Sequence, residues 1–199
     1  EQQGNDSLAF FIRAKTGFIQ YYFDSANAAK ADYLEAIALK EKLPSIADSF
    51  LFIPCLYTGG IYYSQNQFDS ALFYYKKAEQ LNDSYQKPLD QSQRLYNRLG
   101  AMYYETGNYR LAKNYFEKAI TLIVPGQLYL LTNYKINTAS LLVKLEEFDK
   151  AKAVYQSLLP SAAFENEIYH NLAIISIKQK EYQKAIEHLR KVNYTDDKK

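Results

Sequence analysis

The sequence predicts an all-α array of about five helix-turn-helix hairpins, from a recurring residue spacing, regular turn signals and a high apolar content. In each copy of the spacing, a small residue is followed twelve positions later by Ala. A ring or bulky apolar residue comes four positions after that Ala, and a small or apolar residue three further on. The copies begin at Gly17, Gly59, Gly100, Ala139 and Ala173. Such repetition is typical of stacked supersecondary units rather than of one closed globule.

The spacing has a steric cause, which is clearest in the copy formed by Gly100, Ala112, Phe116 and Ala119. Twelve residues allow one helix to end, the chain to turn, and a second helix to begin. The small residues are expected where the paired helices cross, because a larger side chain there would hold the backbones apart. The aromatic residue lies one helical turn after the Ala on the same face, so it fills the space between neighbouring hairpins.

Turn signals fall between the expected helices, and each is followed by an aromatic residue that begins the next helix. The signals are Gln65-Asn66-Gln67, Thr106-Gly107-Asn108, Glu146-Glu147 and Gln179-Lys180-Glu181. The aromatic residues that follow them are Phe68, Tyr109, Phe148 and Tyr182. Four hairpins therefore have a predicted turn and a predicted second-helix start.

These residues resemble the tetratricopeptide repeat, whose signature orders an aromatic residue, Leu-Gly, Tyr, Ala, Phe and Ala. In the third copy the matching residues are Tyr96, Leu99, Gly100, Tyr103, Ala112, Phe116 and Ala119. The resemblance extends over about residues 8 to 194 and implies a right-handed superhelical solenoid. In the first copy two registers stay open. One uses Gly17, Ala29 and Tyr33, and the rival pairs 23–26 with the identical run 68–71.

The predicted organisation is a disordered or trimmed N-terminus at 1–6, an array at 7–194 and a C-terminal tail at 195–199, after which the chain is expected to continue. The approximate units are 7–44, 45–87, 88–125, 126–160 and 161–194. The anchoring alanines at 29, 71, 112, 151 and 185 lie 42, 41, 39 and 34 positions apart. The longer spacings predict extensions at 40–48 and 80–91. Arrays of this period resemble kinesin light chain, the arrays that precede bacterial caspase-like (CHAT) domains, and bacterial sensor regions.

Composition narrows the function classes. The net charge is only +2, and the basic residues form no stretch typical of nucleic-acid binding, so a nucleic-acid partner is not expected. No apolar run approaches the roughly 20 residues that span a bilayer, so direct membrane insertion is not expected. The single Cys excludes an internal disulfide. The absence of a targeting signal leaves the compartment open between cytoplasm and periplasm.

Catalytic and metal-binding patterns are not found, so neither an enzyme activity nor a cofactor is expected. Gly59-Gly60 lies within a predicted helix, where the repeat needs small residues, rather than in a phosphate-binding loop. His170 and His188 lie on different predicted helices, and Cys55 is remote from both. Cys55 takes a core position, whereas a reactive thiol needs exposure and a basic neighbour.

The resemblance implies that the first helix of each hairpin lines a concave groove that binds a peptide or a partner domain. The candidate partner-binding residues are Tyr63, Arg94, Asn97, Arg98, Tyr104, Asn133, Asn137, His170 and Asn171. Arg94 and Arg98 lie one turn apart and could hold a carboxylate in bidentate fashion, or could be ordinary solvated charges. Asn137 and Asn171 hold the place where long-repeat relatives bond the main chain of an extended peptide. The chaperone-tail clamp is disfavoured, because its first-unit Lys and Asn are replaced by Ala14 and Phe18.

Two functions stay open at this point. The first is a passive scaffold that captures a peptide or partner domain without chemistry of its own. The second is the sensory or regulatory region of a larger enzyme-bearing protein, such as a CHAT-type protease or a signalling kinase. Self-association is a further expectation, because no helix follows to cover the last apolar face at Ile186, Leu189 and Val192.

Overall fold

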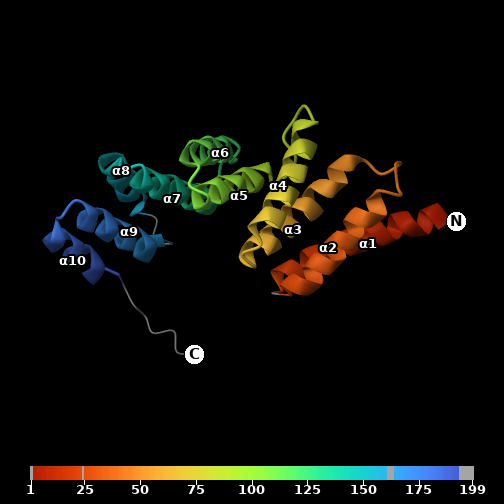
Figure 1. The fold of residues 1–199 in the computed structure, drawn as a ribbon, viewed down its shortest axis with the longest axis horizontal. Coiled ribbons are helices and arrows are strands. Elements are labelled where there is room, and N and C mark those ends of the chain that lie inside the picture. The colour runs from red at the N-terminus through yellow and green to blue at the C-terminus, as the bar shows by residue number, and fades with distance from the viewer. Residues whose placement is uncertain (1, 24, 161–163, 193–199) are drawn as a thin grey trace. The chain divides into compact units, whose positions relative to one another are not determined.

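The computed structural model describes residues 2–23, 25–160 and 164–192, and these residues form ten α-helices, one short 3-10 helix and no strand. Figure 1 labels the helices along the chain. They are α1 (Gln2–Tyr22), α2 (Ala26–Lys40), η1 (Asp48–Leu51), α3 (Phe52–Ser64), α4 (Phe68–Asp83), α5 (Ser92–Glu105), α6 (Tyr109–Thr121), α7 (Leu128–Lys144), α8 (Phe148–Leu158), α9 (Glu165–Lys178) and α10 (Tyr182–Arg190). The chain is an all-α helical-repeat protein.

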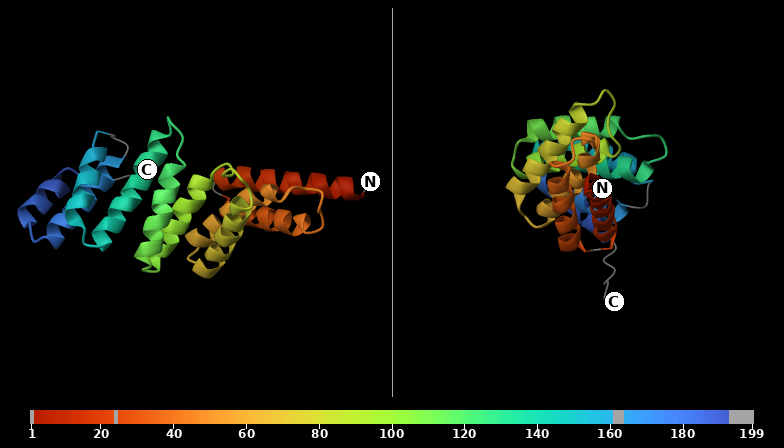
Figure 2. Two further views of the ribbon diagram at one scale, coloured as in Figure 1. Left: turned by 90° about the horizontal axis from the view of Figure 1, so that it is seen from above. Right: turned by 90° about the vertical axis from the view of Figure 1, so that its right-hand side faces the viewer.

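The chain divides into two compact units, Glu1–Met102 and Tyr103–Lys199, and the boundary falls within α5. In the first unit α1 packs on α2, and α3 packs on both α2 and α4. In the second unit α7 packs on α6 and α8, and α9 packs on α8 and α10. Figure 2 shows from two further sides that α1 lies beside α2 and α9 beside α10.

The N-terminal end differs from the sequence expectation. Residues 2–6 were expected to precede the array as a disordered or trimmed end, but they form the first turns of α1. Gln is a good helix former, and a polar sequence can extend a helix whose later turns are held by packing. The expected C-terminal tail at 195–199 lies outside the described residues.

The turns between paired helices share one backbone motif. The turn residues Asn66, Gly107, Glu146 and Lys180 all have φ between 59° and 76°. In each turn the next residue donates its backbone N–H to the carbonyl five positions before it. These bonds run from Gln67 to Tyr62, from Asn108 to Tyr103, from Glu147 to Leu142 and from Glu181 to Ser176, at 2.8–2.9 Å. This is the Schellman arrangement, which satisfies the last carbonyl groups of the first helix.

The second helices begin at the predicted aromatic residues Phe68, Tyr109, Phe148 and Tyr182. The predicted signals therefore located both the end of the turn and the start of the following helix. Asn108 also caps its helix, since its side-chain oxygen accepts the backbone N–H of Leu111 at 3.3 Å.

The helix crossings of the first unit explain why the repeat begins with a small residue. A Cβ on Gly59 would lie 2.6 Å from the Tyr75 ring and 3.2 Å from the Ala71 carbonyl oxygen. A Cβ on Gly17 would meet Tyr33 at 3.0 Å and the Ala29 carbonyl oxygen at 3.2 Å. The first copy therefore has the same geometry as the second, which favours the register of Gly17, Ala29 and Tyr33 over its rival.

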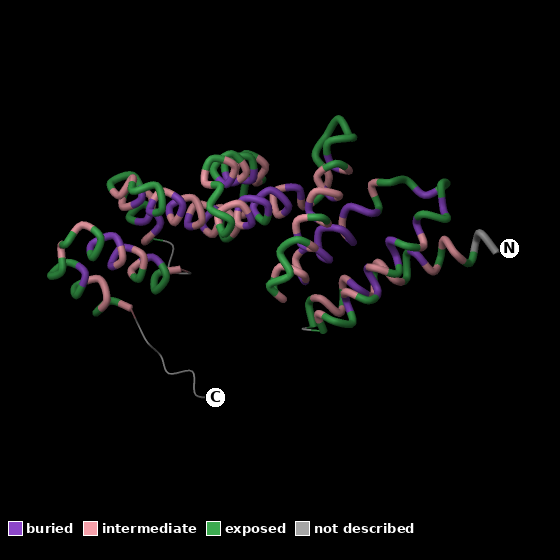
Figure 3. Tube along the Cα trace, in the orientation of Figure 1, coloured by how far each residue is buried: buried purple, intermediate pink, exposed green. Residues whose placement is uncertain are grey.

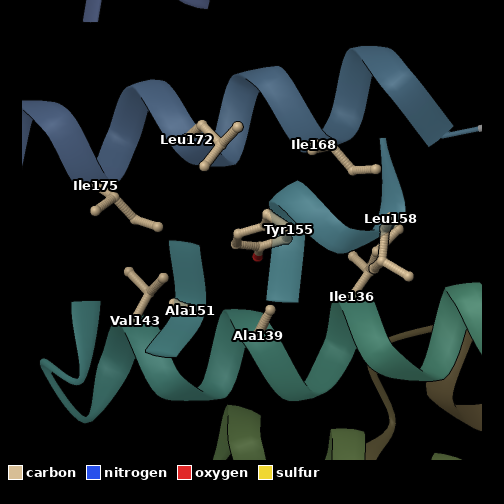
Figure 4. Close-up of a cluster of buried hydrophobic side chains, with 9 residues drawn as sticks. All are labelled: Ile136, Ala139, Val143, Ala151, Tyr155, Leu158, Ile168, Leu172 and Ile175. Carbon is tan, nitrogen blue, oxygen red and sulfur yellow. The ribbon is translucent and has the colours of Figure 1, made fainter. Parts of the chain in front are cut away.

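The buried residues line the facing sides of neighbouring helices, and α3 is buried along most of its length (Figure 3). In the second unit, α7, α8 and α9 share one apolar cluster (Figure 4). Its members are Ile136, Ala139, Val143, Ala151, Tyr155, Leu158, Ile168, Leu172 and Ile175. Tyr155 lies between Ala139 and Leu172, so the aromatic position of the repeat fills the space between successive hairpins.

The two predicted extensions have defined structure. After α2, the buried Lys40 side chain pairs with Asp48 of η1, with 2.7 Å between Nζ and Oδ1. After α4, the buried Asn82 accepts from the Leu89 backbone N–H at 2.9 Å and donates to the Tyr96 hydroxyl at 2.7 Å. Asn82 thus joins α4, the connecting loop and α5 through buried hydrogen bonds, an arrangement that the repeat spacing does not predict.

A lysine directly after the anchoring Ala links one hairpin to the turn of the next. In the first unit Lys30 Nζ donates to Gln65 Oε1 at 2.7 Å. In the second unit Lys152 donates to the side chains of Gln179 and Glu181. We refer to these contacts as the lysine links. They connect the second helix of one hairpin with the next hairpin's Schellman turn.

Candidate functional site

The predicted groove residues divide between the two units. In the first unit, Tyr63 lies on α3, and Arg94, Asn97 and Arg98 lie on α5. In the second unit, Tyr104 lies near the end of α5, Asn133 and Asn137 lie on α7, and His170 and Asn171 lie on α9. All of these positions are on first helices of hairpins.

In the first unit, aromatic rings of α1 and α3 gather into a cluster that we name the tyrosine cluster, formed by Phe18, Tyr21, Tyr22 and Tyr57. The Tyr57 ring lies at the centre, with centroid distances of 4.6 Å to Tyr21, 5.6 Å to Phe18 and 6.4 Å to Tyr22. These separations are in the range of favourable edge-to-face contacts. Four aromatic side chains from α1 and α3 therefore lie together in the first unit.

A hydrogen-bond chain orders this cluster. The Tyr57 hydroxyl donates to Gln91 Oε1 at 2.8 Å and lies 3.2 Å from the Tyr22 hydroxyl. Because Tyr57 has one hydroxyl hydrogen, Tyr22 is the donor in the second bond. Burial raises the pKa of the Tyr57 phenol, whereas the charge of Arg94 acts in the opposite direction. Arg94 therefore lies close enough to the cluster to act on it electrostatically.

A second group of hydroxyls lies beside Gly60, which is partly exposed. The hydroxyl oxygens of Tyr21 and Tyr75 are each 3.8 Å from the position that a Cβ on Gly60 would take. The Tyr75 side chain is fully buried, and its hydroxyl has no hydrogen-bond partner in the part of the chain that the structure describes. Burial raises the pKa of the Tyr75 phenol, and the charge of Arg98 acts in the opposite direction.

The arginines of the first unit fall into two kinds. Arg13 is held by two carboxylates, with Nη1 2.7 Å from Asp32 Oδ1 and Nε 3.0 Å from Glu35 Oε2. Arg94 is half-buried and Arg98 is exposed, and neither has an ion-pair partner among the described residues. Both of these arginines belong to the first unit, where the charge of Arg94 acts on Tyr57 and that of Arg98 acts on Tyr75.

Asn97 differs from the sequence expectation. It was predicted to face a partner, but it is 9% exposed and is engaged within the protein. On α5 it lies between Tyr96 and Leu99, which are both core residues, and at the inner edge of the helix face that carries Arg94 and Arg98. A buried amide that is already engaged within the protein is not a free surface group for a partner.

The predicted residues of the second unit are more varied. The pKa of the Tyr104 phenol is raised by burial, and the Lys144 ammonium lies 5.8 Å from the Tyr104 ring centroid. Asn171 Nδ2 donates to the Glu167 carbonyl oxygen at 2.9 Å, so an incoming peptide would compete with that bond. Asn133 and Asn137 are half-buried and His170 is exposed.

The described residues hold no group of three or more His, Cys, Asp or Glu side chains that could bind a metal ion. Cys55 is buried, and burial raises the pKa of its thiol to about 12. A thiol in that setting is a packing group rather than a nucleophile. Within the described ranges, every helix is too short or too polar to cross a membrane.

The comparisons with known proteins agree with this architecture. The family model described as "Tetratricopeptide repeat" matches residues 59–85, 93–123 and 167–198. Among curated proteins, the Type II methyltransferase M.CeqI of Rhodococcus hoagii is 32% identical over 133 residues, which are 65% of this chain and 25% of that enzyme. The chain thus spans about a quarter of the length of this curated relative.

Solved structures share the fold at low identity. BtubC (BKLC) from P. vanneervenii has a TM-score of 0.73 at 14% identity, covering 96% of this chain and 88% of that one. The pilF protein of Pseudomonas aeruginosa has a TM-score of 0.67 at 15% identity, with coverages of 96% and 80%. YrrB, described as a TPR protein with an unusual peptide-binding site, has a TM-score of 0.64 at 17% identity, with coverages of 90% and 82%.

The repeat matches, the Schellman turns and the glycine crossings describe the same unit. Repeats of this kind present extended surfaces on which other proteins bind, so the chain is in general an interaction scaffold. The chain is a tetratricopeptide repeat protein.

Proposed function

We propose that this chain is a non-catalytic scaffold that captures a peptide or partner domain on the first helices of its hairpins. The observation that carries the proposal is that Arg94 and Arg98 share α5 of the first unit without an ion pair among the described residues, with Arg94 acting on Tyr57 of the tyrosine cluster and Arg98 on the nearby Tyr75. Aromatic and arginine side chains are the residues most often responsible for binding energy at protein interfaces. The peptide-binding site named in the description of YrrB gives the same fold a precedent.

The ligand expected on this surface carries negative charge and apolar groups. A guanidinium binds a carboxylate in bidentate fashion, and neighbouring rings receive the apolar side chains of the same segment. In the second unit, Asn133, Asn137, His170 and Asn171 are the proposed polar contacts to peptide main chain. An amide suits that role because it both donates and accepts.

The test is capture of a partner from lysate of the protein's own source, with the 199-residue chain as bait. The double variant Arg94→Ala/Arg98→Ala is expected to lose the partner while keeping its helical circular dichroism. The matched control is Arg110→Ala/Arg190→Ala, which removes the same charge from two exposed arginines of the second unit. Equal capture by all three proteins would remove the two α5 arginines from the proposed interface.

A second candidate function is favoured by one comparison. We propose as the alternative that the chain is a regulatory region of a larger enzyme-bearing protein, because it matches a quarter of the length of a methyltransferase. The sequence had suggested a CHAT-type protease or a signalling kinase for this role. The full-length gene decides between the two functions. A catalytic domain encoded in the same reading frame supports the alternative, and a stop codon soon after Lys199 supports the independent scaffold.

A further inference from the structure

The outer side of α1 carries apolar residues at positions that are buried in the later first helices. Two positions after the small residue of the repeat, the later side chains are at most 2% exposed, and they are Ile61, Met102, Leu141 and Ile175. The equivalent residue of α1, Ile19, is 50% exposed. Ile12 is 53% exposed, whereas Ile168 at the same position of α9 is fully buried. We name Ile12, Ile19 and the 78% exposed Phe23 the α1 face, since helical spacing places them on one side.

In the later hairpins, the preceding second helix covers the position of Ile19. The residue there shares an apolar cluster with the anchoring Ala and with the ring four positions after that Ala. The three sets are Ile61 with Ala29 and Tyr33, Leu141 with Ala112 and Phe116, and Ile175 with Ala151 and Tyr155. Figure 4 shows the third set, between α8 and α9. The α1 face is therefore shaped to receive a second helix of the repeat type.

α10 is a second helix of this type, and its outer side is partly exposed. In the other hairpins the residue four positions after the anchoring Ala is at most 2% exposed, and these residues are Tyr33, Tyr75, Phe116 and Tyr155. The equivalent residue of α10, Leu189, is only half-buried, and Ile186 is 44% exposed. We name Ile186 and Leu189 the α10 face. It presents the positions that elsewhere pack on a following first helix.

The lysine links identify two positions that meet across a junction between hairpins. Lys30 directly follows the anchoring Ala of its hairpin, and its acceptor Gln65 lies six positions after Gly59. Lys152 and its acceptor Gln179 occupy the same two positions where α8 meets the last hairpin. The position after the Ala therefore faces the position six after the next small residue.

On the α10 and α1 faces, both of these positions carry apolar residues. Ile186 follows the anchoring Ala of α10, where the links have Lys, and Phe23 lies six positions after Gly17, where they have Gln. A lysine facing Phe23, or a glutamine facing Ile186, would lose hydration without gaining a hydrogen bond. Because both members are replaced, the two faces are complementary in chemistry as well as in position.

We propose that the α10 face of one molecule packs on the α1 face of a second molecule, in the arrangement that α8 and α9 adopt within the chain. Ile186 then meets Phe23 of the second molecule, and Leu189 meets its Ile19. The contact is heterologous, because it joins two different surfaces. It goes beyond the proposed scaffold function, since it uses neither Arg94 nor Arg98.

Two variants each block one face. Ile19→Glu and Ile186→Glu place a carboxylate in the apolar contact, which is costly. Both side chains are about half-exposed, so the fold is expected to be retained, as circular dichroism checks. Light scattering is measured up to about 1 mM protein, where even a millimolar dissociation constant gives substantial association. The mass of the unaltered chain is expected to rise with concentration, and each variant alone is expected to remain a monomer.

An equal mixture of the two variants is the decisive sample. Ile19→Glu keeps its α10 face and Ile186→Glu keeps its α1 face, so one contact can form between them. The mass is expected to reach that of a dimer and to stop there, because the two remaining faces are both blocked. The matched control is Phe73→Glu, which places the same carboxylate on a 62% exposed residue of α4, outside both faces. It is expected to associate as the unaltered chain does.

A double variant tests the pairing of Ile186 with Phe23. Ile186→Lys and Phe23→Gln are each expected to weaken association at least tenfold, since each leaves a polar group facing an apolar one. Combined in one chain, they reproduce the Lys–Gln pair of the lysine links across the contact. Association is expected to recover to within about threefold of the unaltered chain, and two independent sites would not show such recovery.

Four results would overturn the head-to-tail contact. A monomer at every concentration of the unaltered chain would exclude it. Association of Ile19→Glu alone would assign the contact to two α10 faces, and association of Ile186→Glu alone would assign it to two α1 faces. A mixture of these variants that stays monomeric would show that the two faces do not bind each other.

Discussion

At the scale of single residues, Gly59 has the strictest steric requirement described in α3. Gly59→Ala would place a methyl group against the Tyr75 ring and close to the Ala71 carbonyl oxygen. We expect a loss of about 1–2 kcal/mol in the free energy of unfolding, since overpacking outweighs the gain in helix propensity. Urea denaturation measures it, with Gly60→Ala as the control that should gain up to about 1 kcal/mol. Equal stabilities for the two variants would contradict the crossing geometry.

The reactivity of the Cys55 sulfur tests whether this side chain is buried in solution. Burial raises the pKa of its thiol to about 12, so at pH 8 the native protein holds it as the neutral thiol. We expect no modification by iodoacetamide at pH 8 in the native state and complete modification in denaturant, as measured by mass spectrometry. Rapid native labelling would show that α3 opens readily at this position.

At the scale of helices and turns, the Schellman motif uses a non-glycine residue in three places. Glu146 and Lys180 have φ near 61°, a conformation that costs a residue with a side chain about 1–2 kcal/mol. Glu146→Gly is expected to raise the free energy of unfolding by about 0.5–1 kcal/mol, after the greater backbone entropy of glycine in the unfolded chain is subtracted.

Gly107→Ala is the matched control for that substitution. Nothing lies within 4 Å of the position its Cβ would take, so only the positive φ opposes the change. A loss of about 1 kcal/mol is expected, and calorimetry measures both variants. If Glu146→Gly is neutral while Gly107→Ala destabilises, the Glu146 side chain contributes contacts that offset its strain.

The sequence predicted the elements well because their signals are local. Turn residues and the following rings determine where Phe68, Tyr109, Phe148 and Tyr182 begin their helices. The Asn82 network, in contrast, depends on a connecting loop whose path no short spacing encodes. The burial of Asn97 was missed for a similar reason. A repeat position predicts which way a side chain points, but it does not predict how far the neighbouring side chains cover it. The different environments of Gly59 and Gly60 appear only when Tyr21 and Tyr75 are placed in space.

At the scale of the whole molecule, buried tyrosines predict alkaline sensitivity. Burial raises the phenol pKa of Tyr33, Tyr57, Tyr75 and Tyr155, the last to about 12. The ordinary phenol pKa is about 10. Because the folded state binds these protons more tightly, their contribution is complete below about pH 9 and is lost as pH rises from 10 towards the folded pKa values.

The measurement is the urea midpoint from pH 7 to pH 11, followed together with tyrosinate absorbance. The midpoint is expected to stay level to about pH 9 and then to fall, with buried phenols ionising only as helicity is lost. A level midpoint through pH 11 would mean that these rings ionise without unfolding the protein.

At the scale of the whole molecule we also predict self-association through the hairpin of α9 and α10. On α10, Tyr182 is 61% exposed and Ile186 is 44% exposed. We expect the mass measured by light scattering to rise with protein concentration, and Ile186→Glu to remove the rise, since a carboxylate in an apolar contact is costly. A monomer at every concentration would exclude this mode of self-association.

The lysine links also bear on how such a chain can change in evolution. Each link joins Lys30 or Lys152 in one hairpin to the turn of the following hairpin. Exchanging a single hairpin that supplies either the lysine or the turn would separate the donor from its acceptor. A segment that keeps the contact intact begins within a second helix and ends in the next turn, as residues 30–65 and 152–181 do. A recombined segment that preserves this contact is therefore shifted by one helix relative to the helix-turn-helix hairpin.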